Sequence, residues 1–316
     1  MKTKIPKNVI VTGGAGFLGS HLVPALMKKG YRVIVIDNLW EGREKNIPEG
    51  AGFGRVDITK RDKLFAAFKQ VSENGGIHGV FHLAALPRVQ FSIDFPAKAH
   101  SVNVNGLINV FDAAAEYGAK RLVYSASSSA YGNQDELPLH EGMVPNPMSP
   151  YAAQKYYGEI MARNYALHSK LGKGLETVSL RYFNIYGPNA DPHGAYAQFI
   201  IKSVDRITHG KTITITGDGL QTRDSVHVSA VVRANILALE SSKVGKGEVI
   251  NIGSGRNVSV LDMAKMIGGE IEFIAPRIEP KHTRADIRKA KELLNWEPTV
   301  TLEEGIAELK KIYGIE

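Results

Sequence analysis

The sequence contains no cysteine, and this absence excludes disulfide bridges, thiolate-bound zinc and cysteine nucleophiles. It also has no uninterrupted apolar run of about 18 residues, the length that a membrane-spanning helix requires. No apolar segment typical of a signal peptide follows the first residues, which lead directly into a predicted strand. The histidines are dispersed without the spacing of metal ligands. We therefore expect a soluble cytoplasmic protein that has no membrane partner and holds no metal.

Long blocks of one charge are also missing, although the chain is basic. It has 39 Lys and Arg against 32 Asp and Glu, a net charge of +7 and a pI near 9.3. The basic residues are scattered or lie among acids, as in the Lys-Arg-Asp-Lys run at 60–63. This pattern favours a solvated surface, with some cations reserved for an anionic substrate, over nucleic-acid binding. The content of 43% hydrophobic and 22% charged residues is ordinary for a globular protein.

A glycine-rich turn near the N-terminus is the first motif with a chemical meaning. A β-branched run at 9–12 leads into Gly13, Gly16 and Gly19, and an apolar-periodic helical segment follows at 21–29. Gly13 permits a sharp turn, Gly16 leaves room for a pyrophosphate, and Gly19 lets the helix lie close to the strand. The helix N-terminus then directs free N–H groups at the phosphates. An ordinary strand–helix turn is the alternative reading of the glycines alone.

An acidic residue at the end of the second predicted strand identifies the kind of dinucleotide. Residues 31–36 form this strand, and Asp37 follows at its carboxyl end. A carboxylate in this place accepts hydrogen bonds from an adenosine ribose and repels a 2′-phosphate. Taken alone, Asp37 is equally well a turn residue. Together with the glycines, it predicts NAD as the cofactor rather than NADP.

Strands and helices alternate along the first half of the chain. Further strands are expected at 54–58, 79–85, 121–125 and 177–183, with helices at 60–72, 95–117 and 150–169. This alternation predicts an α/β fold of the Rossmann type, a doubly wound parallel sheet that binds ligands at the carboxyl ends of its strands.

The regular alternation of predicted strands and helices ends after residue 184. We expect a helix at 196–209 and a strand at 212–216, and then a return to the main sheet at 226–228 that leads into a helix ending at 240. A strand at 248–253, a helix from 259, a strand at 271–274 and helices at 286–294 and 302–313 follow. The predicted domains are an NAD-binding domain, 1–183 with 225–255, and a smaller α/β substrate-binding domain, 184–224 with 256–316.

The residues expected to carry chemistry are a tyrosine and a lysine on one helix. Tyr151 and Lys155 are four residues apart, so their side chains share a face. A tyrosine is a poor base near neutrality, but a neighbouring ammonium favours the phenolate. The pair is then able to take a proton from an alcohol and return it. Ser127, just after the fifth strand, is placed to donate to the same oxygen. Alone, the pair reads as a surface pair and Ser127 as a turn residue.

Several segments together give the chain a family resemblance. It resembles the extended short-chain dehydrogenases/reductases, specifically their nucleotide-sugar epimerase/dehydratase group, over nearly its whole length. Within this group, 181–198 is similar to the UDP-N-acetylglucosamine 4-epimerases. The matching segments are 12–19, 82–85, 125–132, 151–155, 181–184, 217–224 and 289–298.

The resemblance implies a role for each matching position. Phe17 and Leu18 contact the pyrophosphate through their backbone, and Lys155 also bonds the nicotinamide ribose. The full set of expected NAD-binding residues is Gly13, Gly16, Phe17, Leu18, Gly19, Asp37, Asn38, Leu39, Asp57, Ile58, Leu83, Ala84, Ala85, Asn103, Ser125, Tyr151, Lys155 and Phe183.

The same resemblance implies a binding site for a nucleotide sugar. Asn184 and Arg223 meet its diphosphate, Arg277 is a second candidate cation, and Gln198 borders the uracil. The expected substrate-binding residues are Ser127, Ser128, Ser129, Tyr151, Asn184, Gln198, Arg223, Arg277 and Thr283.

The identity of the two residues after Ser127 distinguishes among the reactions that the group catalyses. The related 4,6-dehydratases carry Asp and Glu there, and the decarboxylating enzymes carry Glu at the second position. Ser128 and Ser129 supply no carboxylate, and Thr283 is small enough to admit both acetylated and plain hexoses. We therefore predict NAD-dependent C4 epimerisation of a UDP-hexose: UDP-GlcNAc/UDP-GalNAc, UDP-Glc/UDP-Gal, or both.

Three other functions stay open at this point. They are a UDP-glucuronate 4-epimerase, a nucleotide-sugar reductase, and a non-catalytic NAD-binding sensor, which is the least favoured. The helices at 95–117 and 150–169 resemble those that form a four-helix interface in relatives, so a homodimer is expected.

Overall fold

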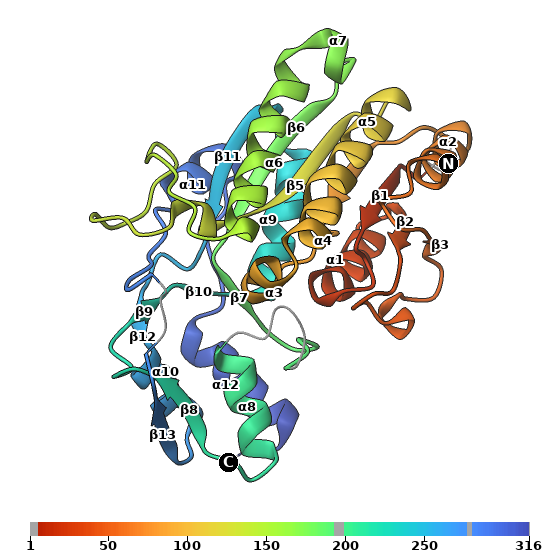
Figure 1. The fold of residues 1–316 in the computed structure, drawn as a ribbon. Coiled ribbons are helices and arrows are strands. Elements are labelled where there is room, and N and C mark those ends of the chain that lie inside the picture. Colours follow the sequence, from red (N-terminus) through yellow and green to blue (C-terminus); the bar gives the residue numbers. More distant parts are fainter. Residues whose placement is uncertain (1–5, 193–198, 277–279, 316) are drawn as a thin grey trace.

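A parallel sheet of seven strands forms the centre of the computed structural model, which describes residues 6–192, 199–276 and 280–315 (Figure 1). The strands lie in the order β11-β6-β5-β4-β1-β2-β3, and every neighbouring pair is parallel. This order confirms the predicted Rossmann-type fold. The bounds are β1 (Asn8–Thr12), β2 (Arg32–Asp37), β3 (Gly52–Arg55), β4 (Gly79–His82), β5 (Arg121–Ser127), β6 (Glu176–Tyr182) and β11 (Lys246–Ile252).

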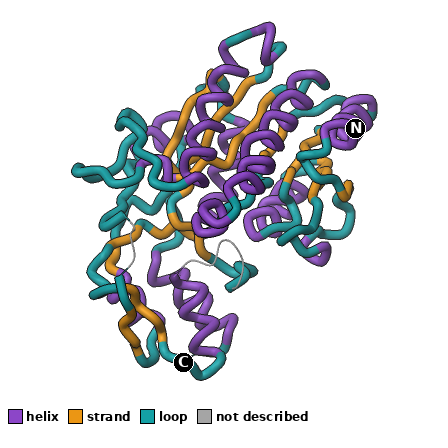
Figure 2. The backbone as a smooth tube through the Cα atoms, in the orientation of Figure 1, coloured by secondary structure: helices purple, strands orange, loops and turns teal. Residues whose placement is uncertain are grey.

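Helices cover both faces of this sheet, because its strands are apolar on both sides. In β1, Val9 and Val11 point into one core and Ile10 into the other. α1 (Phe17–Lys28) and α9 (Val228–Glu240) contribute to the first core. α2 (Arg61–Glu73), α5 (Leu107–Glu116) and α6 (Pro150–Leu167) contribute to the second. Figure 2 shows the strands running between these helices.

The helix expected at 95–117 is present as a continuous helical run over residues 96–116, but its middle is π-helical and a separate short helix precedes it. The chain forms α3 (Val89–Asp94), α4 (Pro96–His100), a π-helical segment η2 (Ser101–Gly106) and then α5. Pro96 at the start of α4 explains the break from α3, since proline fixes its own φ and disfavours helical backbone at Phe95. The wide π turn places Asn103 in the interior.

The return to the main sheet expected at 226–228 is wrong. β10 (Ser225–His227) pairs with β7 (Asn184–Tyr186) in a separate sheet of two strands. The place beside β6 in the main sheet is taken by β11. The strand expected at 54–58 lies slightly earlier, as β3.

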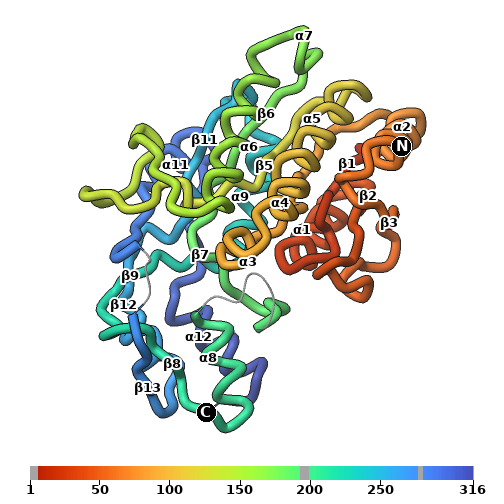
Figure 3. Tube along the Cα trace, in the orientation of Figure 1, coloured from red at the N-terminus to blue at the C-terminus, as the bar shows by residue number. Residues whose placement is uncertain are grey.

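A second group of elements comes from two separate parts of the chain. It contains α8 (Phe199–Thr208), β8 (Ile213–Thr216), β9 (Thr222–Arg223), β12 (Val258–Ser259), α10 (Val260–Ile267), β13 (Ile271–Ile274) and α12 (Leu302–Tyr313). β8 pairs with β13, and β9 with β12. Figure 3 shows these green and blue segments together in the lower part of the view. The domain boundaries given above stay a prediction.

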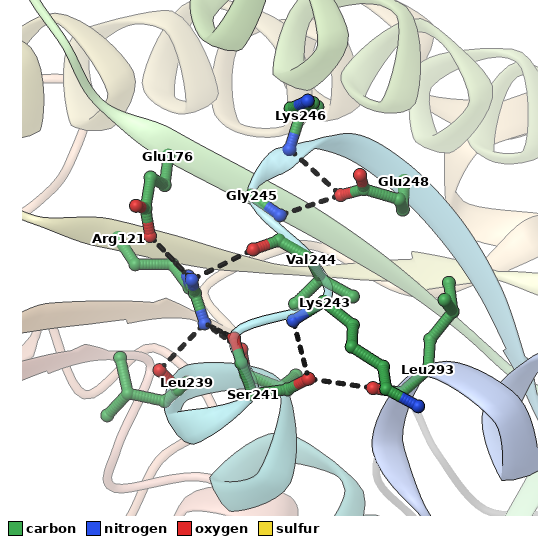
Figure 4. A network of polar contacts seen from close by, with 11 residues as sticks. Arg121, Glu176, Leu239, Ser241, Lys243, Val244, Gly245, Lys246, Glu248 and Leu293 are labelled. Carbon is green, nitrogen blue, oxygen red and sulfur yellow. Dashed lines mark hydrogen bonds and ion pairs between the residues drawn. The ribbon is translucent and has the colours of Figure 1, made fainter.

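A buried arginine fixes the amino ends of two central strands (Figure 4). Arg121 begins β5, and its Nε donates to Glu176, the first residue of β6, at 2.8 Å. The guanidinium also donates to four backbone carbonyls at the end of α9 and beyond it, those of Ala238, Leu239, Ser241 and Val244. The last carbonyls of a helix have no partner within the helix, so this side chain satisfies groups that burial would otherwise leave unpaired. The carboxyl ends of the strands, at the opposite end of the sheet, remain available for a ligand site.

The remaining short elements are η1 (Glu44–Asn46), η3 (Ser128–Tyr131), α7 (Ser169–Gly172) and α11 (Arg288–Leu294). None of the helices within the described ranges combines the length and the apolar character needed to cross a membrane.

Candidate active site

A cavity of about 810 Å³ lies where the strands of the main sheet end. Residues that follow β1, β2, β4, β5 and β6 line it, together with residues near β7, β9 and 280–283. Ligands bind at this edge in open α/β sheets, because the connections there diverge to opposite faces.

Most of the predicted site residues line this one cavity. They are Gly13, Gly16, Phe17, Leu18, Gly19, Asp37, Asn38, Asp57, Ile58, Leu83, Ala84, Ala85, Ser125, Ser127, Ser128, Ser129, Tyr151, Lys155, Phe183, Asn184, Arg223 and Thr283. Leu39 and Asn103 do not line it. Gln198 and Arg277 lie outside the described residues.

The glycine turn has the geometry of a phosphate cradle. Gly13 has φ +74°, and a Cβ there would lie 2.6 Å from the backbone nitrogen of Ala84. A Cβ on Gly19 would lie 2.3 Å from the carbonyl oxygen of Gly14. Gly16 immediately precedes α1 and carries no capping side chain, so the N-terminus of the helix keeps N–H groups for an anion. The turn therefore fits a pyrophosphate that approaches the backbone closely.

Asp37 is held by backbone groups on both sides. Its Oδ2 accepts from the backbone nitrogen of Ala15 at 3.0 Å, and its Oδ1 accepts from that of Leu39 at 2.8 Å. Burial raises the pKa of Asp37, and these two hydrogen bonds act in the opposite direction. Leu39 contributes its backbone nitrogen to this arrangement.

Asp57, shortly after β3, also lines the cavity. Its Oδ1 accepts from the Thr59 backbone nitrogen at 2.9 Å and from the hydroxyl at 2.8 Å, and Asn38 donates to its Oδ2 at 3.3 Å. Partial burial raises the pKa of Asp57, but these hydrogen bonds outweigh burial and the net pKa is lowered. Asp57 is therefore an anion at neutral pH.

Asn103 supports the site from behind. Its Oδ1 accepts from the backbone nitrogen of Leu86 at 2.7 Å, and its Nδ2 donates to the carbonyl of Leu86 at 3.0 Å and to Gln154 at 2.8 Å. This side chain therefore ties the segment after β4, which lines the cavity, to α6.

The proposed catalytic side chains come from α6 and from the end of β5. Ser149 caps α6 by accepting from the backbone nitrogen of Ala152 at 3.1 Å. Tyr151 and Lys155 follow in the first two turns, and only 8% and 4% of their surfaces are exposed. The ammonium of Lys155 donates to the carbonyl of Ser125 at 2.7 Å. The helix cap and the strand end therefore fix this pair at the wall of the cavity.

Burial shifts both titrating groups toward their neutral forms. It raises the pKa of Tyr151 to about 12, while a hydrogen bond with Ser127 acts in the opposite direction. It lowers the pKa of Lys155 to about 7, while the negative charge of Glu159 acts in the opposite direction. Both groups therefore favour their uncharged forms, and a phenolate at this position depends on positive charge nearby.

The segment after Ser127 contains hydroxyls and no acid. Ser127 accepts from the backbone nitrogen of Ser129 at 3.2 Å and from its hydroxyl at 2.8 Å, and Ser128 begins η3. The acidic residues among the described lining residues are Asp37, Glu41, Asp57 and Asp191, and all four belong to other segments.

Sequence reasoning predicted only Asn38 and Leu39 of a loop that packs against the glycine turn and lines the cavity. Residues 38–46, here the clasp loop, hydrogen-bond the carbonyl of Ala15 in the glycine turn through the Arg43 backbone and the Asn46 side chain. Arg43 pairs with Asp191 at 2.8 Å, and Glu41 pairs with Arg88 at 2.8 Å. Lys98 lies 5.1 Å from the ring of Trp40. The polar composition of the loop gave no signal of these partners, which are distant in the sequence.

The second missed residue organises the opposite side of the cavity. Asp224 is completely buried, and its carbonyl accepts from Asn184 at 2.7 Å. Its backbone nitrogen donates to the Thr283 hydroxyl at 3.1 Å, and Arg223 precedes it. The carboxylate accepts four hydrogen bonds from the other chain segments, two from Ser254 and one each from the backbones of Gly255 and Ala285. It stands at the end of the 217–224 motif, which was the available signal.

The remaining lining residues that sequence reasoning did not single out come from neighbouring positions. They include Gly132, Leu139, Tyr182, Asn189 and Pro280. Within the described residues, no three His, Asp or Glu side chains gather in the manner of a metal site.

Comparisons with known proteins agree with this geometry. Residues 9–253 match the model of the NAD dependent epimerase/dehydratase family. A putative UDP-glucose 4-epimerase of Methanocaldococcus jannaschii is 38% identical, over 94% of this chain and 95% of that protein.

Two solved structures are similar over almost their whole length. The UDP-glucose 4-epimerase of Thermotoga maritima with UDP-glucose is 37% identical, covers 97% of this chain and 98% of its own, and has a TM-score of 0.89. The UDP-N-acetylglucosamine 4-epimerase of Methanobrevibacter ruminantium, in complex with UDP-N-acetylmuramic acid, is 33% identical with 97% of both chains covered and a TM-score of 0.87. The predicted resemblance and the predicted NAD dependence are thereby confirmed: the chain belongs to the NAD dependent epimerase/dehydratase family.

Proposed function

We propose that this protein interconverts the C4 epimers of a UDP-hexose, either UDP-glucose and UDP-galactose, their N-acetylated counterparts, or both. The observation that carries the proposal is the convergence of Ser127, Tyr151 and Lys155 on the cavity that also contains the glycine turn. The absence of an acid at Ser128 and Ser129 favours epimerisation over elimination, because elimination also needs a group that moves protons at carbon.

In the proposed reaction, Tyr151 as phenolate takes the proton of the sugar C4 hydroxyl. The cavity would hold NAD through the glycine turn and Asp37, and NAD, when bound, would supply reversible hydride transfer at C4. Ser127 donates to the C4 oxygen and holds the 4-keto sugar in reach. The ammonium of Lys155 stabilises the phenolate, and Tyr151 finally returns the proton. No cofactor is consumed, so NAD should stay bound through the cycle.

The residues present fit both ligands. The glycine turn and the start of α1 suit the pyrophosphate, and Asp37 with Asp57 suits the adenosine. The backbone of Leu83, Ala84 and Ala85 lines the middle of the cavity, where small side chains let a cofactor lie close.

Asn184 and Arg223 are proposed to meet the diphosphate of the nucleotide sugar. Arg277 and Gln198 keep their proposed roles at the diphosphate and the uracil, although the structure does not describe them. Thr283 lines the cavity and is small, so an N-acetyl group should be admitted as well as a hydroxyl.

A time course by NMR tests the function directly. Purified protein without added NAD is mixed separately with UDP-glucose, UDP-N-acetylglucosamine and UDP-glucuronate. The first two should approach an equilibrium mixture of C4 epimers. If UDP-glucuronate alone were converted, it would take the place of the UDP-hexoses as the proposed substrate. A reaction that stops when the bound cofactor is used up would identify a reductase. The proposal would be refuted if none of the three UDP-sugars were converted.

We also propose that the protein is a homodimer. On α6, Ala153, Tyr157, Ile160 and Leu167 form an exposed apolar stripe at helical spacing. The exposed side chains of Val89, Ile93 and Phe95 in the α3 region extend the set of large apolar groups left at the surface. Large exposed apolar patches mark interaction sites, and the pairing of helices on two copies covers such a stripe.

A further inference from the structure

The helix that carries the proposed catalytic pair carries a third buried ionisable residue. Tyr151, Lys155 and Glu159 follow one another at four-residue intervals on α6, so they lie along one helix face. All three are buried. The hydrogen-bond partner of the Lys155 ammonium is a neutral carbonyl, that of Ser125. A buried ammonium is unfavourable unless an anion is near, and Glu159 is one helical turn away.

Glu159 is itself fixed from the neighbouring strand. Arg181 of β6 donates to it through two parallel hydrogen bonds, from Nε at 2.7 Å and from Nη2 at 2.6 Å. The guanidinium lies 4.5 Å from the ring of Tyr131, whose hydroxyl donates to Asn251 at 2.7 Å. The side chains of Glu159 and Arg181 are only 2% and 3% exposed. A planar fork with this geometry leaves the carboxylate little freedom to move.

Stability alone does not account for this pair. Burying two ions removes their hydration, and replacing such a pair with apolar side chains is often neutral or stabilising. Neither residue lines the cavity, so neither contacts a ligand there. Their position one turn behind Lys155 is the feature that requires an explanation.

Among the residues that the structure describes around Lys155, Glu159 is the one anion. From β4, His82 is neutral, because burial and the charge of Lys155 lower its pKa to about 3. From β5, the Tyr124 ring lies 5.2 Å from the ammonium. β6 contributes Arg181 and Tyr182, and α6 itself contributes Tyr151 and Glu159. The charged residues of α3 and α4, Asp94, Lys98 and His100, are exposed to solvent.

We propose that Glu159 is a positioning residue for the reaction: its carboxylate, held in place by Arg181, is the counter-charge that keeps Lys155 an ammonium beside Tyr151. The inference rests on the proposed function, because it assigns the pair a task in supporting the phenolate. Burial lowers the pKa of Lys155 to about 7, and the charge of Glu159 limits that decrease. Burial raises the pKa of Glu159, while Arg181 and Lys155 lower it.

The test is the pH profile of kcat for Glu159→Gln. Removing the negative charge lowers the pKa of Lys155 further, so the ammonium is lost at a lower pH. The alkaline limb of the profile should move down by about one pH unit, at the lower end of the effect of a close opposite charge. Activity on that limb should fall about tenfold at a given pH, since one unit is a factor of ten. KM should change little, because Glu159 does not line the cavity.

Three further variants separate this role from a structural one. Glu159→Gln leaves Arg181 buried without its partner, which destabilises the fold. The double variant Glu159→Leu with Arg181→Met removes both charges at similar volume and should shift the limb in the same direction by a smaller amount, because the positive charge of Arg181 is lost as well. Glu159→Asp keeps the charge and should retain the wild-type limb. Glu176→Gln is the matched control, because it breaks the Arg121 ion pair at the amino ends of the same sheet. It should lower the melting temperature without moving the profile.

A direct titration keeps the inference separate from the proposed function. The ¹³Cε resonance of Lys155, assigned with Lys155→Met, reports the charge of the amine whether or not any UDP-sugar is converted. A lower midpoint in the folded double variant supports the inference. An unchanged midpoint, or an unchanged alkaline limb in either charge-removing variant, overturns it. A wild-type protein that converts no UDP-sugar contradicts only the proposed function, and the midpoint still decides the role of Glu159.

Discussion

At the scale of single residues, Tyr151 concentrates the proposed chemistry in one hydroxyl. It is buried at the cavity wall, next to Ser127 and one turn before Lys155. Burial protects the phenol from bulk water and also raises its pKa, so the phenolate depends on positive charge nearby.

Tyr151→Phe should therefore abolish epimerisation while NAD stays bound. The substitution removes the oxygen and keeps the ring, so the loss in kcat should be at least about a hundredfold, the usual minimum for a general base. Conversion of UDP-sugars by NMR and the absorbance of bound NAD measure the two properties. Tyr157→Phe is the control, because Tyr157 lies on the same helix at the surface. Wild-type turnover by Tyr151→Phe would contradict the mechanism.

A second residue, His82, makes the stability of the folded protein depend on pH. Its Nδ1 lies 2.8 Å from the hydroxyl of Thr12, and burial followed by the charge of Lys155 lowers its pKa to about 3. The unfolded state binds a proton below about pH 6.5, whereas the folded state does not bind one until about pH 3. The contribution of His82 is therefore fully present above pH 6.5 and is lost as the pH falls toward 3.

Urea unfolding should show this loss. Between pH 6.5 and pH 5, His82 should account for about 2 kcal/mol of decreased unfolding free energy. His82→Gln should remove that part of the decrease, although it lowers stability at pH 7. The exposed His168→Gln should leave the difference between the two pH values as it is in the wild type. Equal pH dependence in His82→Gln and wild type would contradict a neutral buried imidazole.

At the scale of elements, the first strand–turn–helix unit depends on one glycine. Gly13 needs a positive φ, and its Cα faces the backbone of Ala84 at the end of β4. A side chain at this place would separate the turn from the strand that it borders, so both the cradle and the sheet edge would move.

Gly13→Ala should prevent retention of NAD and lower the melting temperature. Gly30→Ala is the matched control, since Gly30 has φ +87° and open space around its Cβ position. It should cost about 1–2 kcal/mol for the left-handed backbone and leave NAD bound. Cofactor absorbance after gel filtration and thermal melting give the two readouts. Retention of NAD by Gly13→Ala would show that the turn does not form the cradle.

Elements with strong local signals were predictable. The strands before Gly13 and Asp37 and the helix that carries Tyr151 follow from periodicity and from turn residues. The helix at 95–117 was predicted with nearly its bounds, but its periodicity gave no sign of the π turn inside it or of the short helix that ends before Pro96. The strand at 225–227 was found, but its partner was not, since pairing depends on which strand already occupies the sheet edge.

The site shows the same division between local and distant information. Gly13, Asp37 and Tyr151 lie in motifs whose spacing carries a mechanism, and the cavity contains all three. The clasp loop and Asp224 act through contacts with residues far along the chain, such as Arg43 with Asp191 and Asp224 with Ala285. Only the folded chain places those partners together.

At the scale of the whole molecule, the exposed apolar stripe on α6 is the feature that needs a partner. If it is the dimer interface, a charge at its centre should separate the copies, because a carboxylate loses its hydration there.

Ile160→Glu should convert the protein to a monomer in sedimentation experiments. Leu220→Glu is the matched control, since Leu220 is similarly exposed on the turn after β8. It should leave the assembly unchanged. A monomeric wild type, or a dimer that tolerates Ile160→Glu, would contradict the proposed interface.

The buried carboxylate of Asp224 has a consequence for how the proposed reaction reverses a stereocentre. The carboxylate accepts from Ser254, Gly255 and Ala285, and the backbone carbonyl and nitrogen of the same residue bond Asn184 and the Thr283 hydroxyl, so these segments are joined next to Arg223. If Arg223 binds the diphosphate as proposed, the nucleotide end of the substrate would be anchored there, and only the hexose would have to turn to present its other face. Inversion therefore calls for rotation about the bonds of the substrate, with the protein standing still around it.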